Sequence, residues 1–115
     1  MLKPYYHLNY NEDTGVKDLV EYFIIEQANS KPVYLTINEK TGTKYYYQNR
    51  RFRKFHREDG PAIEWGVGAW NNEEYAALHS KEWYLNGVKL SEEEFNKRMI
   101  MKYQEVIKEL TGNSL

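Results

Sequence analysis

The amino-acid sequence predicts an α+β fold, in which a small antiparallel β-sheet of hairpins packs against an N-terminal and a C-terminal helix. Three observations support this fold class: apolar residues recur at helical spacing near both ends, apolar and polar residues alternate between them, and Gly or Asn-Gly interrupts the alternation. The 115 residues suit a single domain. We divide it into an N-terminal segment and helix (1–32), a sheet with repeat-like hairpins (33–90) and a C-terminal helix (91–112).

The N-terminal helix is expected because apolar residues recur every three or four positions, which is the spacing of an amphipathic helix. These residues are Val16, Leu19, Val20, Phe23, Ile24 and Ala28. Asp13 or Thr14 can cap the helix, and Pro32 ends it because the residue before a proline avoids helical geometry.

The middle of the chain has the pattern of a β-hairpin. Apolar residues alternate with other side chains over 33–37, and residues 43–48 alternate in the same way. The connection between them ends in Gly42, which can adopt the positive φ that a hairpin turn requires. Further short strands are expected at 62–65 and 81–85.

The C-terminal helix has the clearest boundaries. Ser91 and Glu94 form a capping box, and Leu90 with Phe95 forms a hydrophobic staple around it. Gly112 is a suitable terminator. The apolar stripe between them consists of Phe95, Met99, Tyr103, Val106 and Leu110.

Composition limits the possible classes of protein. The sequence has no cysteine, which excludes disulfides, thiolate metal sites and cysteine nucleophiles and fits a reducing compartment. Sixteen basic and seventeen acidic residues nearly balance, which argues against a nucleic-acid coat protein or an acidic DNA mimic. Eleven Tyr, four Phe and three Trp are many rings for this length, and rings serve both cores and binding surfaces. We also expect neither a secretory signal nor a membrane span.

Two strings in the second half resemble a known repeat. Residues 56–62 read His-Arg-Glu-Asp-Gly-Pro-Ala, and residues 83–87 read Trp-Tyr-Leu-Asn-Gly. Together they are similar to the H-R-x-D-G-P-A and W-Y-x-N-G hairpin repeats of bacteriophage proteins, which are loosely akin to MORN repeats. The resemblance covers about Tyr45 to Phe95. It departs from the repeat at 49–55, where the link is longer than usual, and after Gly87, where no second H-R-x-D-G-P string follows.

The resemblance implies a phage-encoded accessory protein in the host bacterial cytosol. Small proteins of this kind often act by binding a host protein, and anti-CRISPR inhibitors are one such group. We therefore expect a non-catalytic protein that binds and inhibits a host bacterial protein, with a defence component such as a CRISPR effector as the first candidate.

The string at 56–62 also contains groups that could perform acid-base chemistry. His56, Glu58 and Asp59 lack a second group at a spacing that would place it within hydrogen-bond reach. Turn chemistry explains the same residues, with Asp59 accepting hydrogen bonds ahead of Gly60 and with Pro61 fixing φ. His7, His56 and His79 are scattered, so no metal site is expected. We expect no catalytic residue, no metal and no cofactor.

One segment concentrates positive charge. Residues 50–57 contain five cations interleaved with Phe52 and Phe55 and follow three consecutive tyrosines. Basic residues with rings suit single-stranded nucleic acid, and arginines suit an acidic protein surface. A solvated loop with locally paired charges is the third interpretation.

A second candidate surface surrounds Trp70 in the glycine-rich stretch 65–72, where the ring either folds back onto the sheet or anchors a partner. Self-association through the apolar stripe of the C-terminal helix is also open, so the protein is either a monomer or a homodimer. The expected partner-binding residues are Arg50, Arg51, Arg53, Lys54, Arg57 and Trp70.

Overall fold

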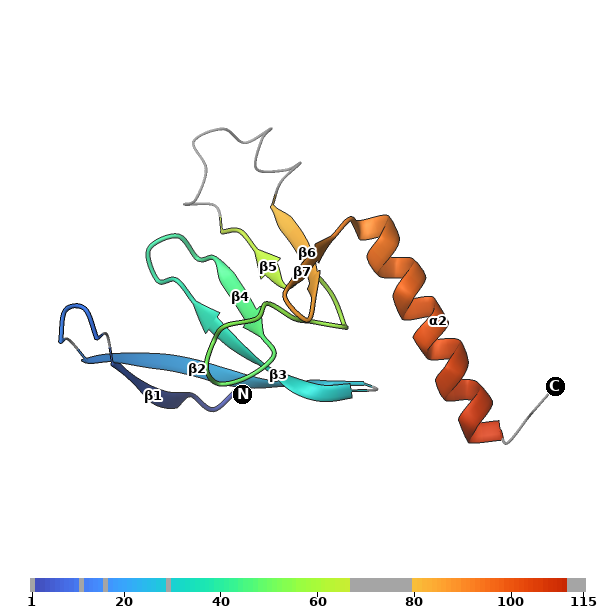
Figure 1. Cartoon of the computed structure of the whole chain (residues 1–115), viewed down its shortest axis with the longest axis horizontal. Helices are drawn as coiled ribbons and strands as arrows, with labels where there is room; N and C mark the ends of the chain where they lie inside the picture. Colours follow the sequence, from blue (N-terminus) through green and yellow to red (C-terminus); the bar gives the residue numbers. More distant parts are fainter. Residues whose placement is uncertain (1, 11, 16, 29, 67–79, 112–115) are drawn as a thin grey trace.

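The computed structural model describes residues 2–10, 12–15, 17–28, 30–66 and 80–111. In this part of the chain, seven strands form one antiparallel sheet in sequence order, followed by one helix (Figure 1). The strands are β1 (Tyr5–Tyr10), β2 (Lys17–Gln27), β3 (Ser30–Ile37), β4 (Lys44–Tyr47), β5 (Ile63–Glu64), β6 (Lys81–Leu85) and β7 (Val88–Leu90), and the helix is α2 (Glu92–Thr111). Each strand pairs with its neighbour in the chain, so the sheet is a meander without crossovers.

The predicted N-terminal helix is wrong, and with it the fold class that placed helices at both ends of the sheet. Residues 17–27 form the long strand β2, which pairs with β1 on one side and β3 on the other. The sequence from Val20 to Ile25 is rich in β-branched and aromatic residues, which favour strands. A single helical stripe also leaves out Tyr22, which is only 4% exposed. The sheet therefore begins at Tyr5 and not at Val33.

The two faces of the sheet are both apolar but differ in kind. Strand register places Phe23, Leu35 and Tyr46 side by side on one face, which holds the buried core of mixed aliphatic and aromatic side chains. Because side chains alternate along a strand, Tyr34 and Tyr47 lie on the opposite face. That face is an aromatic layer, in which successive rings lie 5–7 Å apart as favourable aromatic pairs do.

The predicted β3–β4 hairpin is present, and its turn chemistry is visible. The Asn38 side-chain oxygen accepts hydrogen bonds from the backbone N–H groups of Lys40 (2.9 Å) and Thr41 (3.2 Å). Gly42 has a φ of 78°. The β6–β7 turn uses positive φ at Asn86 (52°) and Gly87 (82°), the pattern of a type I′ hairpin.

Helix α2 is also where the sequence predicts it, and it begins with the expected cap. The Ser91 hydroxyl accepts a hydrogen bond of 3.1 Å from the backbone N–H of Glu94. Phe95 is 4% exposed and anchors the first turns, where the helix contacts β6 and β7. Beyond these turns the helix runs beside the sheet, and Lys102 pairs with Glu58 of the β4–β5 connection (Figure 1). The radius of gyration is 16.9 Å, against about 13 Å for a compact domain of this length.

Gly66 provides a test of the packing between the β3–β4 turn and the end of β5. A Cβ at Gly66 would lie 1.9 Å from the carbonyl oxygen of Thr41, a backbone atom that cannot move aside locally. We expect Gly66→Ala to lower the free energy of unfolding by about 3 kcal/mol, measured by urea denaturation.

The matched control is Gly15→Ala. Gly15 has a φ of 70° and open space around its Cβ direction. We expect a cost of only about 1 kcal/mol there, from backbone strain alone. Equal effects at the two glycines would contradict the close packing at Gly66.

Candidate partner-binding surface

The connection between β4 and β5 contains the basic segment and the His-Arg-Glu-Asp-Gly-Pro-Ala string. We call residues 49–55 the basic loop and residues 56–62 the motif turn. Between them the chain passes from the edge of β4 to the β6–β7 hairpin and hydrogen-bonds to both. The backbone N–H of His56 donates to the Tyr46 carbonyl (3.0 Å), while that of Arg57 donates to the Tyr84 carbonyl (3.3 Å). The Phe55 carbonyl accepts from the N–H of Gly87 (2.9 Å).

The basic loop is held by its two phenylalanines. The Phe52 ring lies 5.3 Å from the Tyr47 ring and 5.7 Å from the Tyr22 ring, both edge to face. The Phe55 ring lies 5.1 Å from the rings of Tyr47 and Tyr84. These contacts cover the aromatic face of the sheet, so the loop serves as part of the core.

Local hydrogen bonds give the basic loop a defined shape. The Asn49 side-chain oxygen accepts from the backbone N–H of Arg51 (3.0 Å), and Phe52 has a φ of 53°. The Lys54 carbonyl accepts from the backbone N–H of Gln48 (2.9 Å), closing the loop. A left-handed conformation in a residue as large as Phe52 persists only where surrounding contacts hold it, which the ring packing does.

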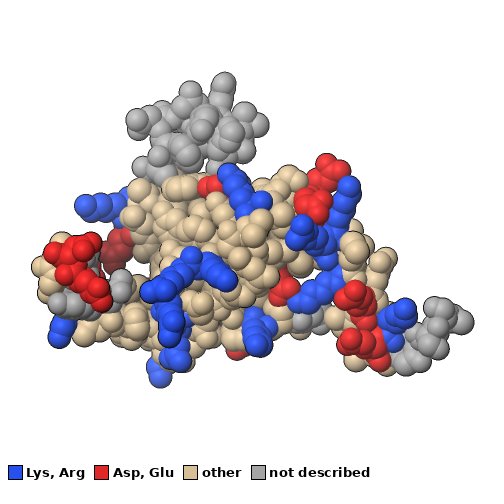
Figure 2. All heavy atoms as spheres, viewed as in Figure 1, with Lys and Arg blue, Asp and Glu red and all other residues tan. Residues whose placement is uncertain are grey.

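Four cations project outward from this fixed loop. Arg50, Arg51, Arg53 and Lys54 are all exposed, and none forms an ion pair with a residue that the structure describes. Figure 2 shows basic side chains gathered on the face of the molecule over the loop that follows β4. Because two phenylalanines hold the backbone, all four cations extend from one ordered segment.

Arg57 has a different environment from the other four. Its guanidinium lies over the Tyr46 ring, 4.0 Å from the centroid, and forms a 2.9 Å ion pair with Glu64. It also donates to the Pro61 carbonyl at 3.2 Å. The side chain is only 20% exposed, so it stabilises the fold and presents little surface to a partner.

The motif turn is clasped to the end of β2 by Gln27. The Gln27 side-chain oxygen accepts hydrogen bonds from the backbone N–H groups of Glu58 (2.6 Å) and Asp59 (3.3 Å). Its amide nitrogen donates to the Ser30 hydroxyl (2.7 Å) and the Lys31 carbonyl (2.8 Å). Gln27 is 7% exposed, so every polar group of a buried amide is used.

Two ionisable side chains of the motif turn have structural partners. Burial lowers the pKa of His56, although the Glu58 carboxylate opposes this, and the neutral ring accepts the Asn86 backbone N–H at Nδ1 (2.9 Å). Burial would raise the pKa of Glu58, but its hydrogen bonds to Lys102 and Ser30 outweigh burial and lower it. Glu58 thereby ties the motif turn to helix α2 through the ion pair with Lys102.

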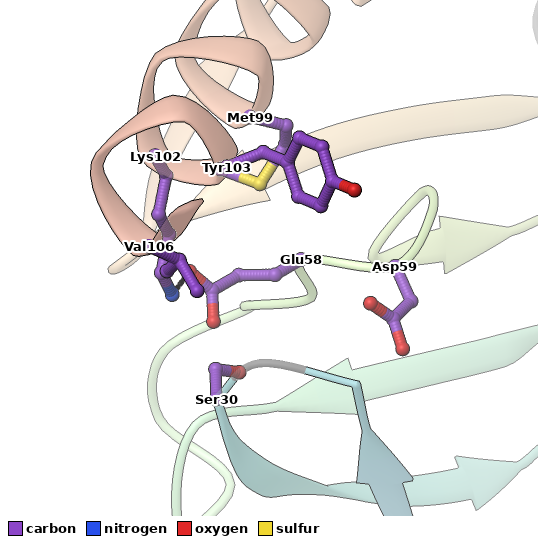
Figure 3. A pocket seen from close by; sticks show the side chains of 7 residues that line it. All are labelled: Ser30, Glu58, Asp59, Met99, Lys102, Tyr103 and Val106. Carbon is purple, nitrogen blue, oxygen red and sulfur yellow. Dashed lines mark hydrogen bonds and ion pairs between the residues drawn. The ribbon is translucent and has the colours of Figure 1, made fainter. Parts of the chain in front are cut away.

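A cavity of about 210 Å³ lies between the helix, the motif turn and the β2–β3 turn. Figure 3 shows Lys102 reaching from the helix toward Glu58, with the Tyr103 side chain above Asp59. The wall of the cavity combines carboxylates with apolar side chains. The lining residues are Ser30, Glu58, Asp59, Met99, Lys102, Tyr103 and Val106. Glu58 and Lys102 form an ion pair, so Asp59 is the one charged side chain of the lining that no ion pair with a described residue neutralises.

Two outcomes concern residues that the sequence indicates, and a third concerns residues that it does not. Trp70 lies outside the described residues. The predicted helix stripe divides: Phe95 is buried, whereas Tyr103 is 57% and Leu110 is 82% exposed. Gln27 and Lys102 were not singled out, because nothing in the sequence links either residue to a turn more than thirty positions away.

Within the described residues, no cluster of three His, Asp or Glu side chains is arranged to hold a metal ion. No described helix is long and apolar enough to cross a membrane. Comparison with protein-family models, curated proteins and solved structures finds no significant match for this chain.

Alanine substitutions can separate the structural arginine from the exposed ones. We expect Arg57→Ala to lower the free energy of unfolding by about 1–2 kcal/mol, because it leaves Glu64 and the Tyr46 ring without their partner. Arg53→Ala should change it by less than about 0.5 kcal/mol, as exposed positions do. Urea denaturation checks both values, and equal costs would contradict the distinction.

The lowered pKa of His56, whose Nδ1 accepts the Asn86 N–H, predicts a pH dependence of stability. The ring is protonated more easily in the unfolded chain, where its pKa is near 6.5, than in the fold, where the pKa is lowered. Its contribution is therefore complete above pH 6.5 and is lost as the pH falls through the folded pKa. The pKa of Glu58 is also lowered, from its ordinary value of 4.5, so its contribution to stability is lost only as the pH falls below that value.

The urea concentration at the unfolding midpoint should decrease when the pH is lowered from about 7.5 to about 5.5. The variant His56→Gln cannot titrate at this position and should show a smaller decrease. His7→Gln is the control, since His7 is exposed and lies outside the motif turn. A decrease that His56→Gln leaves unchanged would assign the pH dependence to another group.

Proposed function

We propose that this chain is a non-catalytic accessory protein that binds and inhibits a host bacterial protein through the basic loop. The observation that supports this function is the set of four exposed cations, Arg50, Arg51, Arg53 and Lys54, held on a fixed aromatic base. Charges on an ordered surface lose less side-chain and backbone freedom on binding than charges on a loose tail. They also steer association with a partner of opposite charge.

The partner we propose is an acidic protein surface. Arginine pairs with carboxylates through two parallel hydrogen bonds and is frequent at energetically important positions of protein interfaces. Two acidic residues of the adjoining chain have other partners, since Glu64 pairs with Arg57 and Glu58 pairs with Lys102. The charges of the loop thus stay available for a second molecule.

Ring orientation favours protein over single-stranded nucleic acid. A stacking platform needs exposed ring faces beside the cations. Phe52 and Phe55 instead pack against Tyr47, and Tyr46 is 5% exposed beneath Arg57. The loop offers phosphate contacts without a base-stacking surface.

The resemblance to phage hairpin-repeat proteins supplies the biological setting of the proposal. It points to the cytosol of a bacterial host and to the components of its defence systems, with CRISPR effectors first. In this setting inhibition would follow from covering an acidic surface that the effector needs for its own partner.

A charge-reversal experiment tests the proposal. The double variant Arg51→Glu and Arg53→Glu should lose a host protein that the wild-type chain captures from bacterial lysate, quantified by mass spectrometry. The matched control, Lys17→Glu with Lys40→Glu, makes the same change in net charge at exposed positions elsewhere, and it should retain that protein. Equal capture by all three proteins would refute the role of the loop.

The salt dependence of binding distinguishes a nucleic-acid partner from a protein partner. If the loop binds nucleic acid, a gel shift with single-stranded DNA or RNA should weaken steeply with salt for any sequence. We expect no shift at physiological salt with the wild-type chain. A sequence-independent, salt-sensitive shift that the double variant abolishes would replace the protein partner by nucleic acid.

A further inference from the structure

The first strand of the sheet has an open edge. Strand β1 pairs with β2 from Tyr5 opposite Tyr22 to Tyr10 opposite Lys17. No described strand pairs with its other side, because β1 is terminal in the strand order. Half of its backbone N–H and C=O groups therefore point toward a vacant strand position.

The opposite edge of the same sheet is protected, and β1 is not. Strand β7 has three residues, its central Lys89 has a side chain 62% exposed, and the chain turns at once into the helix. A short, charged strand is how proteins usually prevent edge pairing. Strand β1 has six residues and contains no Lys, Arg, Asp, Glu or Pro.

Apolar surface accompanies the open edge. Tyr6 is 57% exposed and Leu8 is 54% exposed, and Leu8 lies opposite Leu19, which is 67% exposed. On the other face, Tyr5 stacks on Tyr22 at 5.7 Å. A strand added beside β1 would meet apolar or aromatic side chains on both faces of the sheet.

The charges at the two ends of β1 favour a particular neighbour. Lys3 precedes the strand and Glu12 follows it, and both are exposed. An antiparallel copy of the strand would bring Lys3 of each molecule beside the acidic end of the other. A parallel copy would bring like charges together. The edge is thus self-complementary in the antiparallel sense only.

We propose that β1 pairs antiparallel with β1 of a second copy of this chain, about a two-fold axis perpendicular to the sheet. This axis keeps each face continuous across the dimer and joins the two meanders into one sheet. An interface of six residues per copy is small, so the dimer is reversible and depends on concentration. The proposal is independent of the function assigned to the basic loop.

Sedimentation velocity of the full chain over a range of concentrations tests the dimer. We expect a monomer–dimer equilibrium that Leu8→Lys weakens by about tenfold or more, because a charge then faces the shared edge. The matched control is Leu110→Lys on the helix, where Leu110 is 82% exposed. A dimer that is lost in Leu110→Lys but kept in Leu8→Lys would place the interface on the helix and overturn the proposal. A chain that stays monomeric at all concentrations would overturn it as well.

A charge exchange tests the antiparallel geometry separately. Lys3→Glu and Glu12→Lys should each weaken the dimer, and the variant carrying both should restore it to near the wild-type constant. Circular dichroism with thermal denaturation checks that each variant folds. Single variants without effect, or a double variant weaker than either single one, would refute the antiparallel pairing.

Discussion

The continuity of the sheet depends on a segment that is not itself a regular strand. Strand β5 has only two residues, too few to join β4 to the β6–β7 hairpin along their full length. The gap is closed by the chain around Phe55 to Arg57, which hydrogen-bonds to Tyr46 on one side and to Tyr84 and Gly87 on the other. Buried backbone groups require such partners, so the sequence of this segment is constrained by the sheet.

This constraint explains why the basic loop and the motif turn differ so much in accessibility. The motif turn is occupied by internal contacts: Gln27 binds its backbone, Glu64 binds Arg57, and Lys102 binds Glu58. In the basic loop the rings of Phe52 and Phe55 pack on the sheet, and the stem of Lys54 lies against Gly87. The intervening cations are left outside. A single connection thus supplies both the closure of the core and an exposed charged surface.

Sequence patterns predicted those features whose causes are local. The β3–β4 turn follows from Asn38 and Gly42, and the start of α2 follows from Ser91, because each feature rests on contacts within a few residues. The pattern over β2 failed because Val20 to Ile25 satisfies helical spacing as well as strand composition. Only pairing with β1 and β3 decides between the two, and pairing is not local.

The candidate surface was predictable only where it depends on residues that are close in the sequence. Five cations in one segment are visible in the sequence, but which of them is internal is not. Arg57 is internal because Tyr46 and Glu64 lie beside it in the folded sheet, and neither is close to it in the sequence. The inward direction of Phe52 likewise depends on Tyr22, which lies thirty positions away in a strand that the sequence assigned to a helix.

The sequential order of the strands has a consequence for how the molecule forms. A meander is built from hairpins between chain neighbours, so most of its pairing has low contact order and its early steps require only short loop closures. The contacts of Gln27 with Glu58 and of Phe55 with Gly87 each span about thirty residues and cannot precede the hairpins that they connect. The shape of the charged loop therefore depends on the assembled sheet, because Phe52 and Phe55 pack on rings from β2, β4 and β6.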